Sequence, residues 1–282
     1  MATTRSRPSS TAARSERQAA GVVGDEEPIQ RLTRARLRQL QKLKTARQRR
    51  EQGLFLIDGE KLVREAIDAG APVVELLSTH PEQWLGARQP VTQLSRADAE
   101  RLSDTRTPQG HFALIRDELG GSEPPQGDHW QVVALNAIQD AGNVGGIIRS
   151  AAAFATDAVL VGPGSADPTH PRVTRAATGA WFQVPITRST DLASDIDKHR
   201  NQGGIVLAAD QSGDPLGQLS LPPKIVWLFG NEGAGISEEL APLIDARVAV
   251  PIDDGVDSLN VNVAAGVILH HGYQQAREGS GR

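Results

Sequence analysis

The sequence contains no cysteine, one methionine, one tyrosine and five phenylalanines among its 282 residues. Without cysteine, neither a disulfide framework nor a thiolate metal site can form, and nothing favours export. Because 39% of the residues are hydrophobic but few are aromatic, we expect a core of Val, Ile, Leu and Ala. No apolar run reaches the length of a membrane-spanning helix. We therefore expect a cytoplasmic protein with no membrane partner.

Basic residues are concentrated in the first part of the chain. Residues 1–118 contain 20 Lys and Arg against 16 Asp and Glu, which leaves 10 against 18 in the remainder. Residues 31–50 hold nine basic residues and no acidic one, with leucines at helical spacing. This pattern predicts one amphipathic helix whose outer face contacts phosphate groups, although a merely solvated face is the alternative. The predicted contacts are Arg34, Arg38, Lys42 and Arg49.

Composition and periodicity divide the chain into four parts. Residues 1–28 have no periodic apolar pattern and no signal-peptide core, which predicts a disordered tail. Strands and helices alternate through residues 29–117, as in a small α/β domain. Residues 118–128 (ELGGSEPPQGD) have the composition of a linker. A second α/β domain occupies residues 129–282. In the first domain we predict strands at 53–58, 73–77, 91–94 and 111–115, and helices at 59–68 and 96–102.

Three predicted strands of the second domain run into glycine-bearing polar loops. Strand 132–138 leads to a helix at 143–154 that Asn143 should cap, which places Arg149 on its second turn. Strand 225–229 leads to a loop and a helix start at 236–240. Strand 246–252 leads to a helix at 259–276. Strands that alternate with helices form parallel sheets, so these loops should meet at one ligand-binding edge. Further strands are predicted at 157–162, 182–185 and 204–209, helices at 170–180 and 191–199, and a loop at 210–224.

The residues of these loops resemble a known family. DAGNVGGIIR (140–149), LFGNEG (228–233), and Ile252 with SLNV (258–261) are similar to the three motifs of the SpoU (TrmH-type) RNA ribose 2'-O-methyltransferases of the SPOUT superfamily, in the same order. In the first domain, LFLIDGEKLVR (54–64) resembles the substrate-binding domain, similar to ribosomal protein L30e, that precedes many rRNA-directed members.

The resemblance implies an enzyme that methylates ribose 2'-hydroxyls in RNA with S-adenosyl-L-methionine as cofactor. The L30e-like domain favours rRNA, 23S rRNA above all, over tRNA. The implied fold is α/β, with a trefoil knot in the C-terminal parallel-sheet domain, a rare exception to the absence of knots in proteins. The family forms homodimers through the knot region. The apolar face of helix 259–276 suits such an interface, but could equally belong to the core.

The resemblance also implies the donor-binding and catalytic residues, and no metal ion. Backbone groups at Ala209, Gly230, Ile252 and Leu259 correspond to the donor-binding positions, for which ordinary turn geometry is the alternative.

Arg149 matches the family's essential arginine. Because a guanidinium scarcely deprotonates in a protein, we assign Arg149 to holding a phosphate of the target and stabilising the developing alkoxide. Glu232 could orient Arg149 or accept a proton through water. Asn143 would help to place the substrate. Ser258 and Asn260 would shape the site, with helix capping as the alternative for Ser258.

Two other classes of function remain open in the sequence. The first is an RNA-binding ribosome assembly factor that keeps the fold without turnover; the presence of Arg149, Asn143 and Glu232 argues against it. The second is a dinucleotide-dependent oxidoreductase. It is disfavoured because the glycines at 142, 145 and 146 do not have G-x-G-x-x-G spacing.

Overall fold

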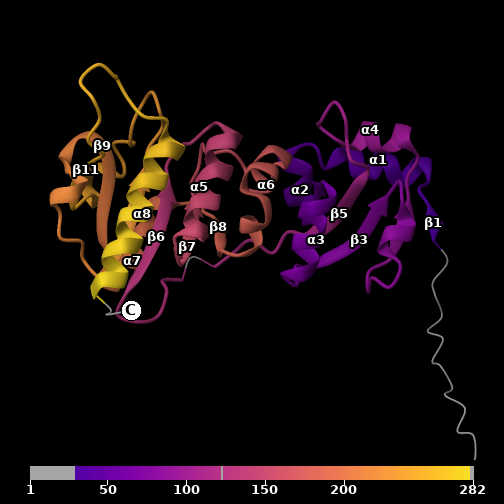
Figure 1. Cartoon of the computed structure of the whole chain (residues 1–282), viewed down its shortest axis with the longest axis horizontal. Helices are drawn as coiled ribbons and strands as arrows, with labels where there is room; N and C mark the ends of the chain where they lie inside the picture. Colours follow the sequence, from indigo (N-terminus) through magenta and orange to yellow (C-terminus); the bar gives the residue numbers. More distant parts are fainter. Residues whose placement is uncertain (1–28, 122, 280–282) are drawn as a thin grey trace, which may run out of the picture.

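The computed structural model describes residues 29–121 and 123–279. The predicted tail, residues 1–28, lies outside the described residues. Two α/β lobes lie side by side along the long axis of the molecule, with α6 of the second lobe facing α2 and α3 of the first (Figure 1). Among the described residues, no helix is both long enough and apolar enough to cross a membrane.

The first lobe is a mixed five-stranded sheet of order β1-β4-β3-β5-β2 with helices on both faces. β5 is antiparallel to β2 and β3, whereas β1, β4 and β3 are parallel to one another. Four predicted strands and two predicted helices of this lobe are confirmed to within one residue at each end: β2 (Leu54–Asp58), α3 (Glu60–Asp68), β3 (Val73–Ser78), β4 (Val91–Gln93), α4 (Arg96–Leu102) and β5 (His111–Arg116). The lobe also contains β1 (Gln30–Arg31), α1 (Arg34–Lys42) and α2 (Ala46–Gln52).

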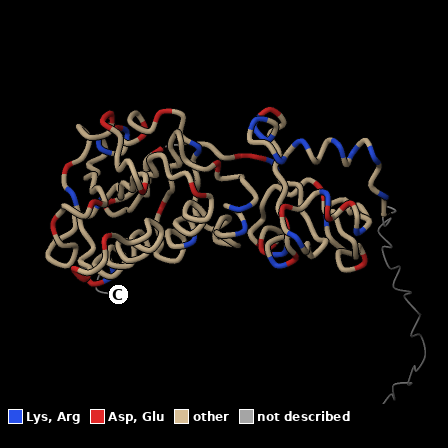
Figure 2. Tube along the Cα trace, turned by 90° about the horizontal axis from the view of Figure 1, so that it is seen from above, with Lys and Arg blue, Asp and Glu red and all other residues tan. Residues whose placement is uncertain are grey.

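The basic segment 31–50 is two helices, so the prediction of a single helix was wrong. α1 ends at Lys42, and the hydroxyl of Thr45 then accepts a hydrogen bond from the Gln48 amide and caps α2. The break turns Arg49 inward. Its side chain is 1% exposed, so the prediction that Arg49 contacts RNA from the surface was also wrong. Arg34, Arg38 and Lys42 are exposed along α1, where Figure 2 shows basic positions recurring with no acidic ones between them.

The second lobe is a six-stranded sheet of order β11-β9-β10-β6-β7-β8. Every neighbouring pair is parallel, which confirms the predicted parallel sheet. The trefoil knot stays a prediction. The elements are β6 (Trp130–Leu135), α5 (Ala141–Ala153), β7 (Ala158–Val161), α6 (Pro171–Ala177), β8 (Ile186–Arg188), α7 (Leu192–Arg200), β9 (Ile205–Pro215), β10 (Lys224–Phe229), β11 (Ala246–Ala249) and α8 (Val261–Gly279).

Three local predictions in this lobe were wrong. Residues 178–182 form a 3-10 helix, and the strand placed at 182–185 begins only after Pro185, as β8. No helix starts at 236–240, because Pro242 lacks the amide hydrogen a helix needs and only a 3-10 turn, Ala241–Leu243, forms. β9 continues to Pro215 through part of the predicted loop, since its end pairs with β11 across a bulge.

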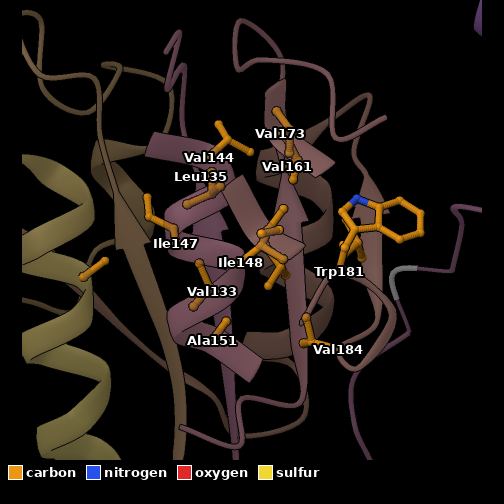
Figure 3. Packing of buried hydrophobic residues seen from close by; sticks show 14 of the residues in the cluster. Val133, Leu135, Val144, Ile147, Ile148, Ala151, Val161, Val173, Trp181 and Val184 are labelled. Atoms are coloured by element: carbon orange, nitrogen blue, oxygen red, sulfur yellow. The ribbon is translucent and has the colours of Figure 1, made fainter. Parts of the chain in front are cut away.

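Side chains alternate between the two faces of the sheet. Val133 and Leu135 of β6 belong to the cluster that contains Ile147 and Ile148 of α5, as Figure 3 shows, together with Leu269 of α8. The intervening β6 residues belong to a second cluster with α7. Strand periodicity therefore places α5 and α8 on one face and α7 on the other. The core is largely aliphatic as predicted, although Trp227, Phe55, Phe112 and Phe229 are among its largest buried side chains.

The two lobes share one continuous hydrophobic cluster. The rings of Phe55 on β2 and Trp181 of the second lobe lie 5.1 Å apart between centroids. Glu65 of α3 lies directly over Gly179, where a Cβ atom would come within 2.7 Å of the Glu65 carboxyl carbon. The first lobe is therefore packed against the second, and α1 has a fixed place relative to the parallel sheet.

A buried ion network also spans this contact. Arg49 Nε donates to the Thr169 hydroxyl at 2.9 Å, and the Arg49 guanidinium lies 3.7 Å from Asp167. Arg188 lies 2.9 Å from Asp117 and 3.3 Å from Asp167. Burial alone would raise the pKa of Asp167, but hydrogen bonds from Thr169 and the charges of Arg188 and Arg49 outweigh it and lower that pKa. Asp167 is therefore charged and compensated.

We expect Arg49→Ala to lower the free energy of unfolding by about 3 kcal/mol, measured by urea denaturation. Removing one partner of a buried ion pair costs about 3–5 kcal/mol, and the low end applies because Arg188 still compensates Asp167. The control is Arg50→Ala, whose side chain is 59% exposed and should contribute less than about 1 kcal/mol. Equal losses in the two variants would contradict the structural role of Arg49.

Candidate active site

A pocket of about 540 Å³ lies at the carboxyl edge of the parallel sheet, between the ends of β9, β10 and β11 and the start of α8. Its volume is in the range of small-molecule sites. All four predicted donor-binding residues line it, as do three of the five predicted catalytic residues. These are Ala209, Gly230, Ile252 and Leu259, and Glu232, Ser258 and Asn260.

The lining of the pocket combines apolar walls with negative charge. Phe229, Val248, Val250 and Ile268 contribute apolar surface. Asp210 and Glu232 contribute carboxylates, and none of the described residues that line the pocket is Lys, Arg or His. The pocket therefore suits a ligand that carries an apolar or aromatic part and a positive charge.

The loop after β10 closes one side of the pocket. The backbones of Asn231 and Gly235 exchange two hydrogen bonds of 2.9 Å each, and the Asn231 side-chain oxygen accepts from the amides of Gly233 and Ala234. A Cβ atom on Gly230 would lie 2.6 Å from the backbone carbon of Gly235. Only glycine fits at position 230, and its backbone faces the pocket without a side chain.

Asn143 does not cap α5, contrary to the sequence prediction. The helix begins two residues earlier, and its cap is Asp140, whose carboxylate accepts a hydrogen bond of 3.0 Å from the Asn143 amide. Asn143 is thus the third residue of α5, and its side chain is free to face the loops.

The Asn143 side chain joins two of the pocket residues. Its Nδ2 donates to Glu232 Oε1 at 2.5 Å, and its Oδ1 accepts from Asn260 Nδ2 at 3.1 Å. This chain connects the start of α5, the loop after β10 and the residue before α8. It fixes the direction of the Glu232 carboxylate at the mouth of the pocket.

Arg149 does not line the pocket. It is the ninth residue of α5, on the third turn rather than the predicted second. Its side chain is exposed, and within the described part of the chain it makes no hydrogen bond or ion pair. The guanidinium is therefore available for a ligand outside the pocket.

Two lining residues, Asp210 and Gln211, were missed in the sequence. Hydrogen bonds from the Ser212 amide and hydroxyl, with the Arg247 ion pair, lower the pKa of Asp210. Gln211 Nε2 donates to the Asp257 carbonyl at 2.9 Å and holds the loop after β11 over the pocket. Their place directly after Ala209, at a predicted strand end, was the available signal. No group of three or more potential metal-binding side chains occurs among residues 29–121 and 123–279.

Comparison with known families agrees with this geometry. Residues 131–270 match the model of the SpoU rRNA Methylase family, and residues 34–113 match that of the MRM3-like substrate binding domain. The chain is 32% identical over 237 residues to the 23S rRNA (guanosine(2553)-2'-O)-methyltransferase RlmP of Bacillus subtilis. This alignment covers 82% of this chain and 92% of RlmP. The chain therefore belongs to the SpoU rRNA methylase family and is an RNA methyltransferase with an N-terminal substrate-binding domain.

Solved structures of the family have the same fold. The SpoU methyltransferase AviRb from Streptomyces viridochromogenes, in complex with AdoMet, superposes with a TM-score of 0.79 at 26% identity, over 89% of this chain and 100% of AviRb. An AdoMet-bound rRNA methyltransferase from Sinorhizobium meliloti superposes with a TM-score of 0.76 at 25% identity, over 89% of this chain and 98% of that methyltransferase. Membership of this family excludes the oxidoreductase alternative.

Proposed function

We propose that this enzyme transfers a methyl group from S-adenosylmethionine to a ribose 2'-hydroxyl in 23S rRNA. The observation that carries the proposal is the hydrogen-bonded chain Asn260–Asn143–Glu232 at the mouth of a pocket without cationic side chains. The name of RlmP supports the target, and the AdoMet complexes of the two neighbours support the donor. A ribosomal target would place the enzyme in the cytoplasm.

The pocket fits the donor in both shape and charge. S-adenosylmethionine supplies a methyl group on a positively charged sulfur. The Glu232 carboxylate favours that positive charge, whereas Asp210 is already paired with Arg247, and the backbones at Ala209, Gly230, Ile252 and Leu259 offer hydrogen-bonding groups beside the apolar walls. Gly230 lets the backbone come close to the ligand where a side chain would block it.

The remaining residues act on the RNA. Asn143 holds one oxygen of Glu232, so the carboxylate is directed to accept the proton of the 2'-hydroxyl through water. Arg149 holds a phosphate of the target nucleotide and stabilises the developing alkoxide, since it keeps its own proton. Ser258 and Asn260 shape the cavity in which the sugar is positioned. Positioning of donor and hydroxyl supplies most of the acceleration.

The first lobe is proposed to recognise rRNA. Residues 29–117 form the substrate-binding domain, 118–128 the linker and 129–282 the catalytic domain. Arg34, Arg38 and Lys42 are exposed along α1, where they can bind phosphates. The match of residues 34–113 to a substrate-binding domain supports this assignment.

Methyl transfer to rRNA tests the function. We expect the protein with labelled S-adenosylmethionine to methylate unmodified 23S rRNA on one ribose, mapped by alkaline hydrolysis resistance. Transfer to tRNA alone would refute 23S rRNA as the target.

Arg149→Ala should abolish methyl transfer and leave the affinity for S-adenosylhomocysteine within about twofold, because Arg149 lies outside the pocket. Loss of donor binding by a folded Arg149→Ala protein would refute the role of the arginine.

The loop after β10 gives a second test. Gly230→Ala should weaken S-adenosylhomocysteine binding at least tenfold in calorimetry, because the new methyl group meets the backbone of Gly235. Gly233→Ala is the matched control: its Cβ would lie 3.6 Å from the Asn231 side chain, an ordinary contact. Equal affinities of the two variants would mean that this loop does not form the donor site.

We also propose a homodimer through α8. Val263 and Val267 lie one turn apart on this helix and are 50% and 43% exposed, whereas Ile268 and Leu269 of the predicted face are buried in the core. Two exposed valines on one turn provide apolar surface for a second copy.

Charged substitutions on α8 should separate the protomers. We expect light scattering to give twice the chain mass for the native protein and the single chain mass for Val263→Glu/Val267→Glu, since carboxylates cannot be buried unpaired. Leu85→Glu, at a 59% exposed position in the first lobe, should stay dimeric. A double variant that stays dimeric would place the interface elsewhere.

A further inference from the structure

Two exposed arginines, Arg50 and Arg172, lie between the basic helix α1 and the active site. Arg50 is near the end of α2, and Arg172 is the second residue of α6. Resting on the proposed function, we propose that both bind backbone phosphates of the RNA and carry it from α1 to Arg149. They would complete a line of cations across the junction of the two lobes.

Arg50 carries a positive charge that the fold does not need. Its Nε lies 3.6 Å from Asp167 and its side chain is 59% exposed. Asp167 is already compensated by Arg49 and Arg188, and Arg188 is also paired with Asp117. Within this network, three cations (Arg49, Arg50 and Arg188) thus meet two carboxylates (Asp117 and Asp167). The exposed Arg50 is the surplus cation, and an anion from outside can pair with it.

Arg172 has one acidic partner, and the contact is loose. Its guanidinium lies 3.4 Å from Asp140, with both side chains in solvent at 60% and 49% exposure. Such a surface pair contributes about 0–1 kcal/mol. The other oxygen of Asp140 caps α5 beside Asn143. A phosphate bound to Arg172 would therefore lie next to the helix that carries Asn143 and Arg149.

Arg50, Arg172 and Arg149 lie on three helices that follow one another across the molecule: α2, α6 and α5. α6 lies between α2 and α5 (Figure 1). Thr169, three residues before Arg172, accepts the hydrogen bond from buried Arg49, and the Ser165 hydroxyl accepts from the amide of Ile138, just before α5. These two hydrogen bonds thus link α2 to the loop before α6, and that loop to the segment before α5. The backbone positions that carry Arg50 and Arg172 are therefore fixed relative to α5.

The row formed by Arg50, Arg172 and Arg149 suits RNA as its ligand better than a protein partner. The cations are arginines, which bind phosphates with two parallel hydrogen bonds, and the path joins a basic helix at one end to a nucleic-acid-modifying site at the other. No large apolar side chain on α2, or on the loop before α6, is among the exposed ones of the described residues. Phosphate contacts position RNA without reading its sequence.

The salt dependence of RNA binding tests the path. We expect Arg50→Gln/Arg172→Gln to reduce the slope of log K against log salt by about 1.4–1.8 on transcribed 23S rRNA, from two contacts of about 0.7–0.9 each. Affinity for S-adenosylhomocysteine should not change. The control removes two cations at the amino edge of the sheet: Arg200, the last residue of α7, and Lys224, the first residue of β10. Arg200→Gln/Lys224→Gln should leave the slope unchanged.

The outcomes separate this inference from the proposed function. If the native protein methylates 23S rRNA but the folded Arg50→Gln/Arg172→Gln variant keeps the native slope, the path is refuted while the function stands. A control variant with the same loss of slope would also refute it, because the effect would then be one of net charge. Weakened binding to ribosomal particles with unchanged binding to bare rRNA would assign the surface to a ribosomal protein instead. Absence of methyl transfer by the native protein refutes the proposed function itself.

Discussion

Parallel pairing of β9, β10 and β11 is the constraint on which the site depends. Parallel strands end at the same edge, so three loops that are distant in sequence enclose one pocket. β6 is parallel to β10 as well, which brings the start of α5 to the same edge. The Asn260–Asn143–Glu232 chain can form only because the segments that follow β6, β10 and β11 meet there. The pocket and the start of α5 are thus held by one sheet.

The packing of the first lobe on the second is another constraint. The first lobe packs on the second through Phe55 and Trp181 and through the buried Arg49–Asp167–Arg188 network. A buried ion network adds little net stability over an apolar contact but requires one arrangement of its partners. The basic helix α1 is therefore held in one orientation relative to the pocket.

Much of this arrangement could be predicted from the sequence, and the failures have physical causes. Apolar strands that end in glycine-bearing loops predicted the parallel sheet and the edge at which these loops enclose a pocket, and the family resemblance picked out four of the residues that line it. Asp140 was missed as the cap because Asp and Asn are equally good caps and the choice depends on where β6 ends. Arg49 was assigned to the surface because burial of an arginine depends on partners more than a hundred residues away. The same holds for Pro215 of β9, whose pairing with β11 is a long-range contact.

The central claim is that the carboxyl-edge pocket binds the methyl donor beside Asn143 and Glu232. A crystal structure of the protein with S-adenosylhomocysteine tests it most directly. The account predicts ligand density between the segments 209–211, 229–235 and 252–261, with the sulfur facing Glu232. Density at another place, such as the cavity lined by Arg31, Arg36 and Glu75 beside β1 and β4 of the first lobe, would contradict it.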